Sequence, residues 1–178
     1  FEFGIFYGEE TGDGVVSITE ETTSRLVGNV VFKKTSDELC ILTGATSVQI
    51  SSAMIDEDYR GFALATTAYG KLAEYFHVVS DSVQTVGGAA LWKNKIAATP
   101  SLTVHVIVDC DTTPRMLPDP NNEIQVYDSS KVYLEKLIWS SKDQKTFELA
   151  GSLGIESSVG EHYQSRVLIA KRKDNPQH

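Results

Sequence analysis

Alternating apolar and polar residues predict short β-strands in the first third of the chain. The clearest strand patterns cover residues 1–7, 25–32 and 48–55. A further short apolar run at 38–42 is interpreted as one more strand. Small residues interrupt the apolar pattern at 51–53, and small residues in a strand often mark a place that another group approaches closely.

After the strand at 48–55 the pattern changes to that of a helix. Apolar residues recur every three or four positions over 62–76, and a second helical pattern covers 85–97. Short strands are predicted at 77–79 and 101–108. This order of strands and helices predicts a mixed sheet with helices packed on its faces.

The last third of the chain carries weaker patterns. Residues 111–123 contain three prolines and many turn formers, which predicts a long loop. A strand is expected at 124–127, and 130–139 fits either a helix or a strand. A short helix is expected at 145–153 and a last strand at 166–171.

The composition is that of a folded protein. Hydrophobic residues make up 41% of the 178 residues, enough to bury the core of one domain. No apolar run approaches the roughly 20 residues of a membrane helix, and no signal-peptide pattern is present, so we expect a cytoplasmic protein. The chain begins with Phe1, not Met, and we expect a natural N-terminal stretch to precede it.

Charge and metal-binding residue types limit the function classes. The net charge of -8 argues against nucleic-acid binding and is compatible with a cationic partner such as an amine or a lysine-rich peptide. Cys40 and Cys110 lie in apolar runs and are predicted to be buried free thiols. The four histidines are scattered without metal-ligand spacing, so no metal site is expected.

The segment 55–72 carries the clearest chemical signal. A strand ends, a short polar turn follows, and a helix begins directly after Arg60 and Gly61. The unpaired N–H groups of a helix N-terminus and the helix dipole favour an anion, and a glycine lets the backbone approach it closely. Thr66 and Thr67 offer hydroxyl donors near the first turn. The segment therefore predicts a phosphate-binding loop.

This segment resembles the acyl-CoA loop of the GNAT N-acetyltransferase superfamily, whose signature is Gln/Arg-x-x-Gly-x-Gly/Ala. Arg60, Ala63 and Ala65 hold the signature positions, and Tyr59 matches an aromatic residue that precedes them in the family. The resemblance covers about residues 25–108. It implies an α+β fold with a mixed, mostly antiparallel central sheet and helices on both faces.

The same resemblance sets the expected domain organisation. Residues 1–178 are expected to form a single domain, with a core at 25–108 completed by the final strand at 166–171. Residues 111–165 have no counterpart in the resemblance and are interpreted as an insertion. A lid, a partner surface, a structural cap and a dimer contact all remain open for this insertion.

The resemblance implies acetyl-CoA as the cofactor. In the family the strand before the loop splays from its neighbour, and the pantetheine arm pairs with the exposed strand edge. Here the backbone of Ala53, Met54 and Ile55 is expected to bind pantetheine. The predicted cofactor-binding residues are Met54, Ile55, Arg60, Gly61, Phe62, Ala63, Leu64 and Ala65.

Catalytic residues are harder to assign. The small side chains of Ser51 and Ser52 leave room for the thioester and the amine. Backbone N–H groups near Met54 and Ile55 are expected to polarise the thioester carbonyl. The amine must lose a proton, so a carboxylate base is required. We name Asp81 and Ser52 as the catalytic residues, with Asp56 or Glu57 as further candidates for the base.

Two positions depart from the family pattern. Ala63 replaces the central glycine; we expect alanine to adopt helical dihedrals there and to weaken cofactor binding without abolishing it. Trp92 follows Leu91 where the family often has a tyrosine that protonates the leaving thiolate. Because an indole is no acid at physiological pH, that role is vacant or filled elsewhere.

The sequence therefore predicts an enzyme that moves an acetyl group from acetyl-CoA to a primary amine, of a small molecule or a protein, by direct attack in a ternary complex. A homodimer is compatible with this prediction. The alternative is a catalytically degenerate binding protein on the same fold, acting through a protein partner. A third reading, an unrelated mixed-sheet domain, would be supported by a strand before Asp56 that is antiparallel and fully paired on both edges.

Overall fold

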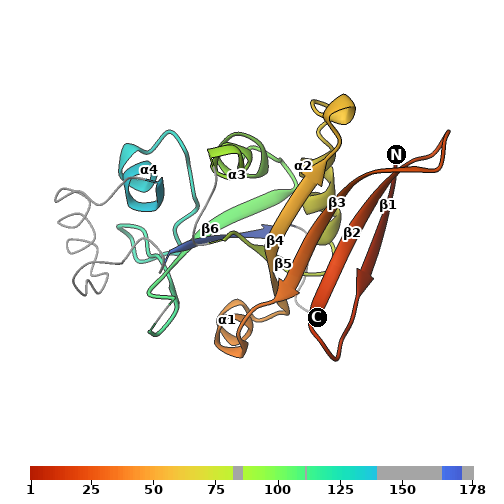
Figure 1. Ribbon diagram of the computed structural model, residues 1–178. Helices are drawn as coiled ribbons and strands as arrows, with labels where there is room; N and C mark the ends of the chain where they lie inside the picture. Colours follow the sequence, from red (N-terminus) through yellow and green to blue (C-terminus); the bar gives the residue numbers. More distant parts are fainter. Residues whose placement is uncertain (82–85, 111, 140–165, 174–178) are drawn as a thin grey trace. The chain divides into compact units, whose positions relative to one another are not determined.

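The computed structural model describes residues 1–81, 86–110, 112–139 and 166–173 (Figure 1). The chain forms two compact units. The first contains Phe1–Val79 together with Lys171–His178, and the second contains Ser80–Ala170. Each unit is described by itself.

The first unit is built on five neighbouring strands. The strands are β1 (Glu2–Tyr7), β2 (Asp13–Glu20), β3 (Arg25–Lys34), β4 (Ser47–Ile55) and β5 (His77–Val79), in that spatial order. Neighbours from β1 to β4 are antiparallel, and β5 runs parallel to β4. Figure 1 shows β1 to β4 side by side. Strand β2 is not among the predicted strands, although its Val16 and Ile18 alternate with polar residues and are fully buried.

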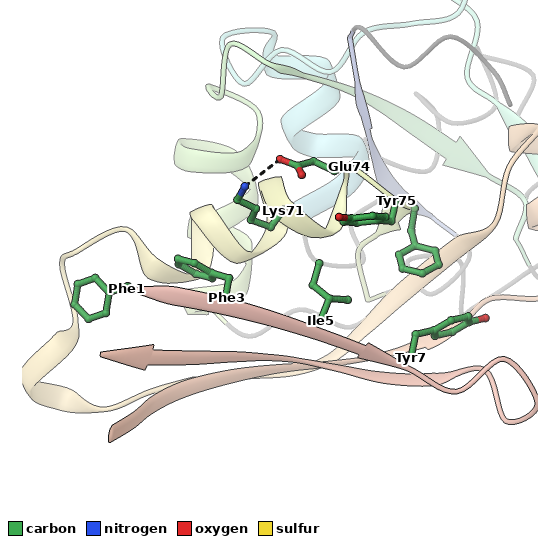
Figure 2. Close-up of a pocket in the computed structure, with 8 residues that line it drawn as sticks. Phe1, Phe3, Ile5, Tyr7, Lys71, Glu74 and Tyr75 are labelled. Atoms are coloured by element: carbon green, nitrogen blue, oxygen red, sulfur yellow. Dashed lines mark ion pairs between the residues drawn. The ribbon is translucent and has the colours of Figure 1, made fainter. Parts of the chain in front are cut away.

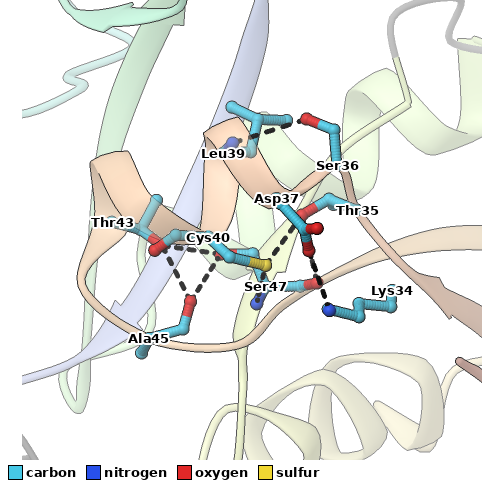
Figure 3. Close-up of polar contacts among 9 residues, drawn as sticks. All are labelled: Lys34, Thr35, Ser36, Asp37, Leu39, Cys40, Thr43, Ala45 and Ser47. Carbon is cyan, nitrogen blue, oxygen red and sulfur yellow. Dashed lines mark hydrogen bonds and ion pairs between the residues drawn. The ribbon is translucent and has the colours of Figure 1, made fainter.

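The run that we interpreted as a strand at 38–42 is a helix, α1 (Asp37–Thr43), and that prediction is wrong. Ser36 caps its N-terminus by accepting a hydrogen bond from the Leu39 N–H, and Gly44 ends it in the left-handed conformation with φ 73°. The Thr43 and Ser47 hydroxyls lie 2.7 Å apart and join the helix to β4 (Figure 3). These local caps outweigh the short apolar run.

Helix α2 (Leu64–Leu72) covers the sheet of the first unit and begins two residues later than the sequence pattern predicts. Its buried residues recur at helical spacing and pack on the strands, whereas Phe62 stays exposed. The core of this unit includes Val16, Ile18, Val27, Val30, Phe32, Val48, Ile50, Leu64, Ala68, Leu72 and Val78.

In the second unit, β6 (Leu102–Val108) lies between β7 (Arg115–Met116) and β8 (Val167–Arg172), of which Val167–Ala170 belong to this unit. Its helices are α3 (Val86–Leu91), a π-helical turn (Trp92–Ile96) and α4 (Val132–Trp139). The predicted helix at 85–97 is thus confirmed for its described residues, and the ambiguous segment at 130–139 is helical. The core of this unit includes Trp92, Ile96, Val104, Val106, Ile107, Leu117, Leu134, Leu137, Leu168 and Ile169.

These pairings confirm the predicted α+β class with mixed, mostly antiparallel strands. The proposed insertion at 111–165 is described only for 112–139, and the helix expected at 145–153 lies outside the described residues. Cys40 and Cys110 are free thiols, as predicted, but each is half-buried, and Cys40 lies in α1. Among the described residues, no helix is long and apolar enough to cross a membrane.

Candidate functional site

The two edges of strand β4 are paired to different extents. On one side it pairs with β3 along its length, as far as Ile55 opposite Gly28. On the other side its parallel pairing with β5 covers only Ser47 to Gln49. From Ile50 onward this second edge has no strand partner within the described part of the chain, and residues 51–54 are exposed. Full pairing on both edges would have supported the reading as an unrelated mixed-sheet domain, and the β5 side of β4 is paired only at Ser47–Gln49.

The pairing register decides which backbone groups reach this open edge. The Asp56 N–H donates to the Val27 carbonyl oxygen at 2.9 Å, which continues the β3–β4 ladder. Because antiparallel strands alternate between bonded and non-bonded pairs, the N–H and C=O of Met54 face β3, and those of Ala53 and Ile55 face outward.

Gly28 confirms where the Met54 carbonyl points. A β-carbon placed on Gly28 would lie 2.8 Å from the Met54 carbonyl oxygen, so only glycine fits beneath it. The expectation that the Met54 backbone binds pantetheine therefore conflicts with the register, since those groups are turned toward β3. The outward N–H and C=O of Ala53 and the N–H of Ile55 are the groups that remain available, since the Ile55 carbonyl already accepts a hydrogen bond from the Arg60 Nε at 3.3 Å.

A β-bulge lies at the point where β4 becomes exposed. Val31 pairs with Ser52 and Phe32 pairs with Ile50, which leaves Ser51 as an extra residue on β4. A bulge bends the strand and redirects its side chains, and bulges are common next to active sites. The side chains of Ser51 and Ser52 are exposed, as the sequence-based interpretation requires of residues that leave room for substrates.

The loop after β4 leads directly into α2. A 3-10 turn, Glu57–Tyr59, is followed by Arg60 in an extended conformation and by Gly61 at φ 95°, a value that favours glycine. Ala63 is the N-cap of α2 and has φ 57° and ψ 21°. We expected ordinary helical dihedrals at Ala63, and that expectation is wrong because the residue is left-handed.

The beginning of α2 presents a group of N–H donors. The first bond into the helix runs from the Thr67 N–H to the Ala63 carbonyl oxygen, and the N-cap has no side-chain hydrogen bond. For the six N–H groups from Gly61 to Thr66, no acceptor is found among the described residues. With no acidic residue in the first turn of α2, these donors and the helix dipole favour an anion. The Thr67 hydroxyl is engaged, since it donates to the Ala63 carbonyl at 3.1 Å.

The charges around the loop partly cancel. The Arg60 side chain is 65% exposed; its Nε donates to the Ile55 carbonyl oxygen at 3.3 Å, and it pairs with Glu57 at 3.4 Å. Arg25 of β3 pairs with Asp56 at 2.9 Å. Asp56 and Glu57 thus form ion pairs with arginines. These pairs fit a role as solvated surface charges better than the role of a catalytic base.

Aromatic side chains flank the loop. The rings of Phe1 and Tyr59 meet edge to face at 6.0 Å, and Phe1 lies equally far from Phe62. The Arg25 guanidinium lies over the Tyr59 ring at 5.8 Å. Desolvation and the nearby Glu20 raise the pKa of Tyr59, so its hydroxyl stays protonated at neutral pH. This contact of Phe1 with Tyr59 is not predictable from local sequence, because the two residues are far apart along the chain.

The predicted catalytic residues fall in different units. Ser52 belongs to β4 of the first unit, and Asp81 is an exposed residue of the second. Trp92 is only 1% exposed and belongs to the core of the second unit, so it offers no acid where the family often has a tyrosine. The described residues contain no cluster of His, Cys, Asp and Glu that would hold a metal ion.

Comparison with known proteins gives a limited likeness to a solved structure. No protein-family model matches the chain, and no curated protein matches its sequence. A crystal structure of a ribosomal-protein-alanine N-acetyltransferase from Brucella melitensis biovar Abortus 2308 is similar, with a TM-score of 0.38 and 19% sequence identity. The likeness covers 46% of this chain and 60% of that structure.

Proposed function

We propose that this chain is an N-acetyltransferase that uses acetyl-CoA and acts on a primary amine. The observation that supports this proposal most is that an open strand edge leads directly into a loop with exposed N–H groups. The open edge of β4 ends at Ile55, and the loop that follows presents the N–H groups from Gly61 to Thr66. A long ligand with amides at one end and phosphates at the other matches this arrangement.

The residues fit the parts of acetyl-CoA in order. The outward backbone groups of Ala53 and Ile55 would pair with the amides of the pantetheine arm, as an added strand does. The N–H groups from Gly61 to Ala65 and the guanidinium of Arg60 would bind the pyrophosphate. The exposed serines at the bulge, Ser51 and Ser52, would lie beside the thioester.

In the proposed reaction the amine nitrogen attacks the thioester carbonyl carbon. A C–N bond forms, the C–S bond breaks, and the thiol of CoA leaves with a proton. The chain would contribute mainly by holding both substrates in position and by polarising the carbonyl with a backbone N–H of β4. Asp81 is the proposed acceptor of the amine proton, and Ser52 the proposed side chain next to the reacting carbon.

A second candidate is a binding protein that has kept the fold and lost catalysis. Two observations favour it. Ala63 holds a left-handed conformation that is strained for a residue with a β-carbon, and the Trp92 indole is buried where the family often has an acid. Such a protein would act through a partner and show no turnover.

Thermal unfolding with acetyl-CoA, free CoA and ATP tests the proposal first. A ligand at about 100 times its dissociation constant adds about 2.7 kcal/mol, which raises the midpoint by several degrees. We expect both CoA compounds to raise it and ATP to have little effect. No rise with either CoA compound would reject the cofactor assignment.

Turnover separates the two candidates. Release of the CoA thiol is followed over a panel of small amines and peptides with a free N-terminus or lysine. Stabilisation by CoA together with turnover supports the enzyme. Stabilisation without turnover on any amine supports the binding protein.

A further inference from the structure

Strand β1 forms an edge of the first unit. Within the described residues it pairs only with β2, and the Gly8 N–H donates to the Asp13 carbonyl at 2.9 Å as the ladder ends. By the antiparallel alternation, the backbone groups of Glu2, Gly4 and Phe6 face β2. The N–H and C=O groups of Phe3, Ile5 and Tyr7 point away from β2, along the open edge of the sheet.

The same three residues line a groove of about 600 Å³ against the end of α2 and the residues that follow the helix. Figure 2 shows their side chains rising from β1 toward the helix. The groove is mainly aromatic and apolar; its lining residues are Phe1, Phe3, Ile5, Tyr7, Lys71, Glu74, Tyr75 and Phe76. Lys71 pairs with Glu74 at 3.4 Å, and Arg172 lies 3.8 Å from the same carboxylate, so two cations share the negative charge of Glu74.

This edge lacks the usual protection against strand pairing. Exposed edges are commonly blunted by lysine, proline, bulges or inward charges. β1 has none of these: Glu2 is its only charged residue, and its register with β2 is unbroken. Phe6, on the face opposite the groove, is 63% exposed.

We propose that β1 pairs with β1 of a second copy of this chain, antiparallel and about a two-fold axis at Ile5. A two-fold interface must be complementary to itself, and this strand is. With Ile5 opposite itself, Phe3 faces Tyr7 of the partner subunit, and all these residues carry outward backbone groups. Each such pair exchanges two N–H···O bonds, and the aromatic side chains form cross-strand pairs.

The other positions in this register are also compatible. Gly4, which has no side chain, faces the exposed Phe6 of the partner subunit on the opposite face of the sheet. Glu2 faces Gly8 of the partner subunit, so like charges are not brought directly together. The two-fold axis runs perpendicular to the sheet, and the grooves of both copies join into one apolar layer.

Sedimentation velocity over a range of concentrations tests the proposal on the full chain. We expect the wild type to move from the 19.5 kDa of one chain toward twice that mass as concentration rises. Ile5→Pro removes an N–H that the β1–β2 ladder does not use, so it should give a folded monomer. Phe6→Ser should also shift the equilibrium at least tenfold toward monomer, and Ile41→Ser, at an equally apolar site on α1 that is 80% exposed, should not.

A wild type that stays at the mass of one chain at every concentration overturns the proposal. A dimer that survives Phe6→Ser as well as Ile5→Pro overturns it too, since another surface must then carry the contact. Circular dichroism of each variant shows whether it folds, and Phe6→Ser keeps the test valid if Ile5→Pro does not.

The register has its own test. Bonded antiparallel pairs place their Cα atoms about 5.5 Å apart, within the range that a disulfide spans. Ile5→Cys should therefore form a cross-linked dimer under mild oxidation. Position 6 is more exposed but faces Gly4 of the partner subunit, so Phe6→Cys should cross-link at least tenfold more slowly. The wild type, oxidised in the same way, measures the background reaction of Cys40 and Cys110. Equal rates for the two variants would reject the two-fold axis at Ile5.

Discussion

The Nε of Arg60 donates a hydrogen bond to the carbonyl oxygen of Ile55 across 3.3 Å. This bond ties the only arginine of the loop to the last residue of β4, whose carbonyl points away from β3. The two regions proposed to bind opposite ends of one ligand, the strand edge and the loop, are thus held together by a side chain with an exposed charge.

Arg60→Glu should weaken binding of acetyl-CoA. It replaces a cation beside the proposed pyrophosphate site with an anion, next to Glu57 and Asp58, which are already exposed. We expect the dissociation constant to rise at least about tenfold, or ~1.4 kcal/mol. Isothermal titration calorimetry measures this dissociation constant. Lys33→Glu, at an exposed position of β3, is the control with the same change of charge. Equal affinities of the two variants would remove Arg60 from the site.

Ala63→Gly should stabilise the fold. A left-handed conformation costs an L-residue roughly 1–2 kcal/mol, and the greater freedom of glycine in the unfolded chain offsets about 0.4–1 kcal/mol of that gain. We expect a net increase of about 0.5–1 kcal/mol in urea unfolding and tighter CoA binding. Ala65→Gly, inside the first turn of α2, should instead destabilise by about 1 kcal/mol. A less stable Ala63→Gly variant would contradict the strain at this position.

Ala53→Pro should impair cofactor binding more than stability. It removes an outward N–H of β4 and leaves the ladder with β3 intact, whereas Met54→Pro removes an N–H that faces β3. We expect Ala53→Pro to lower CoA affinity at least about tenfold, and Met54→Pro to lower the unfolding midpoint more. Calorimetry and thermal unfolding on both variants give the comparison. A larger stability loss in Ala53→Pro would show that the alternation is reversed.

Much of the first unit can be predicted from local sequence. The apolar residues recur with the spacing of a strand in β1, β3, β4 and β5, and with the spacing of a helix in α2. Helix α1 was misread since its decisive signals are the caps, Ser36 and Gly44, and not its apolar run. The site was predicted to the level of the segment only. Which N–H groups of β4 face outward depends on its register with β3, which no local pattern encodes. The dihedrals of Ala63 are likewise imposed by the turn that joins Gly61 to α2.

The pKa of Asp128 should depend on Ser130. The Ser130 hydroxyl and N–H donate to this carboxylate at 2.7 and 2.9 Å and lower its pKa below the model-peptide value of 3.8. A depressed carboxylate pKa stabilises the fold above pH 3.8, and this contribution is lost as pH falls through the folded-state pKa.

Ser130→Ala should therefore raise the Asp128 pKa in an NMR titration. It should also lower stability at pH 7, with a difference from wild type that shrinks at acid pH. An unchanged Asp128 titration would show that the Ser130 hydroxyl does not donate to this carboxylate in solution. Thr112→Ala, which removes an unrelated hydroxyl of the same unit, serves as the control.

The uneven edges of β4 give neighbouring amides very different contact with water. The protons of Ser52 and Met54 are held in the ladder with β3, whereas those of Ala53 and Ile55 meet solvent wherever no other molecule lies along the strand. Deuterium uptake along these four residues should therefore alternate between slow and fast. A molecule that pairs with the open edge would protect the N–H groups of Ala53 and Ile55 and abolish the alternation. Deuterium uptake along β4 therefore shows whether the edge is occupied.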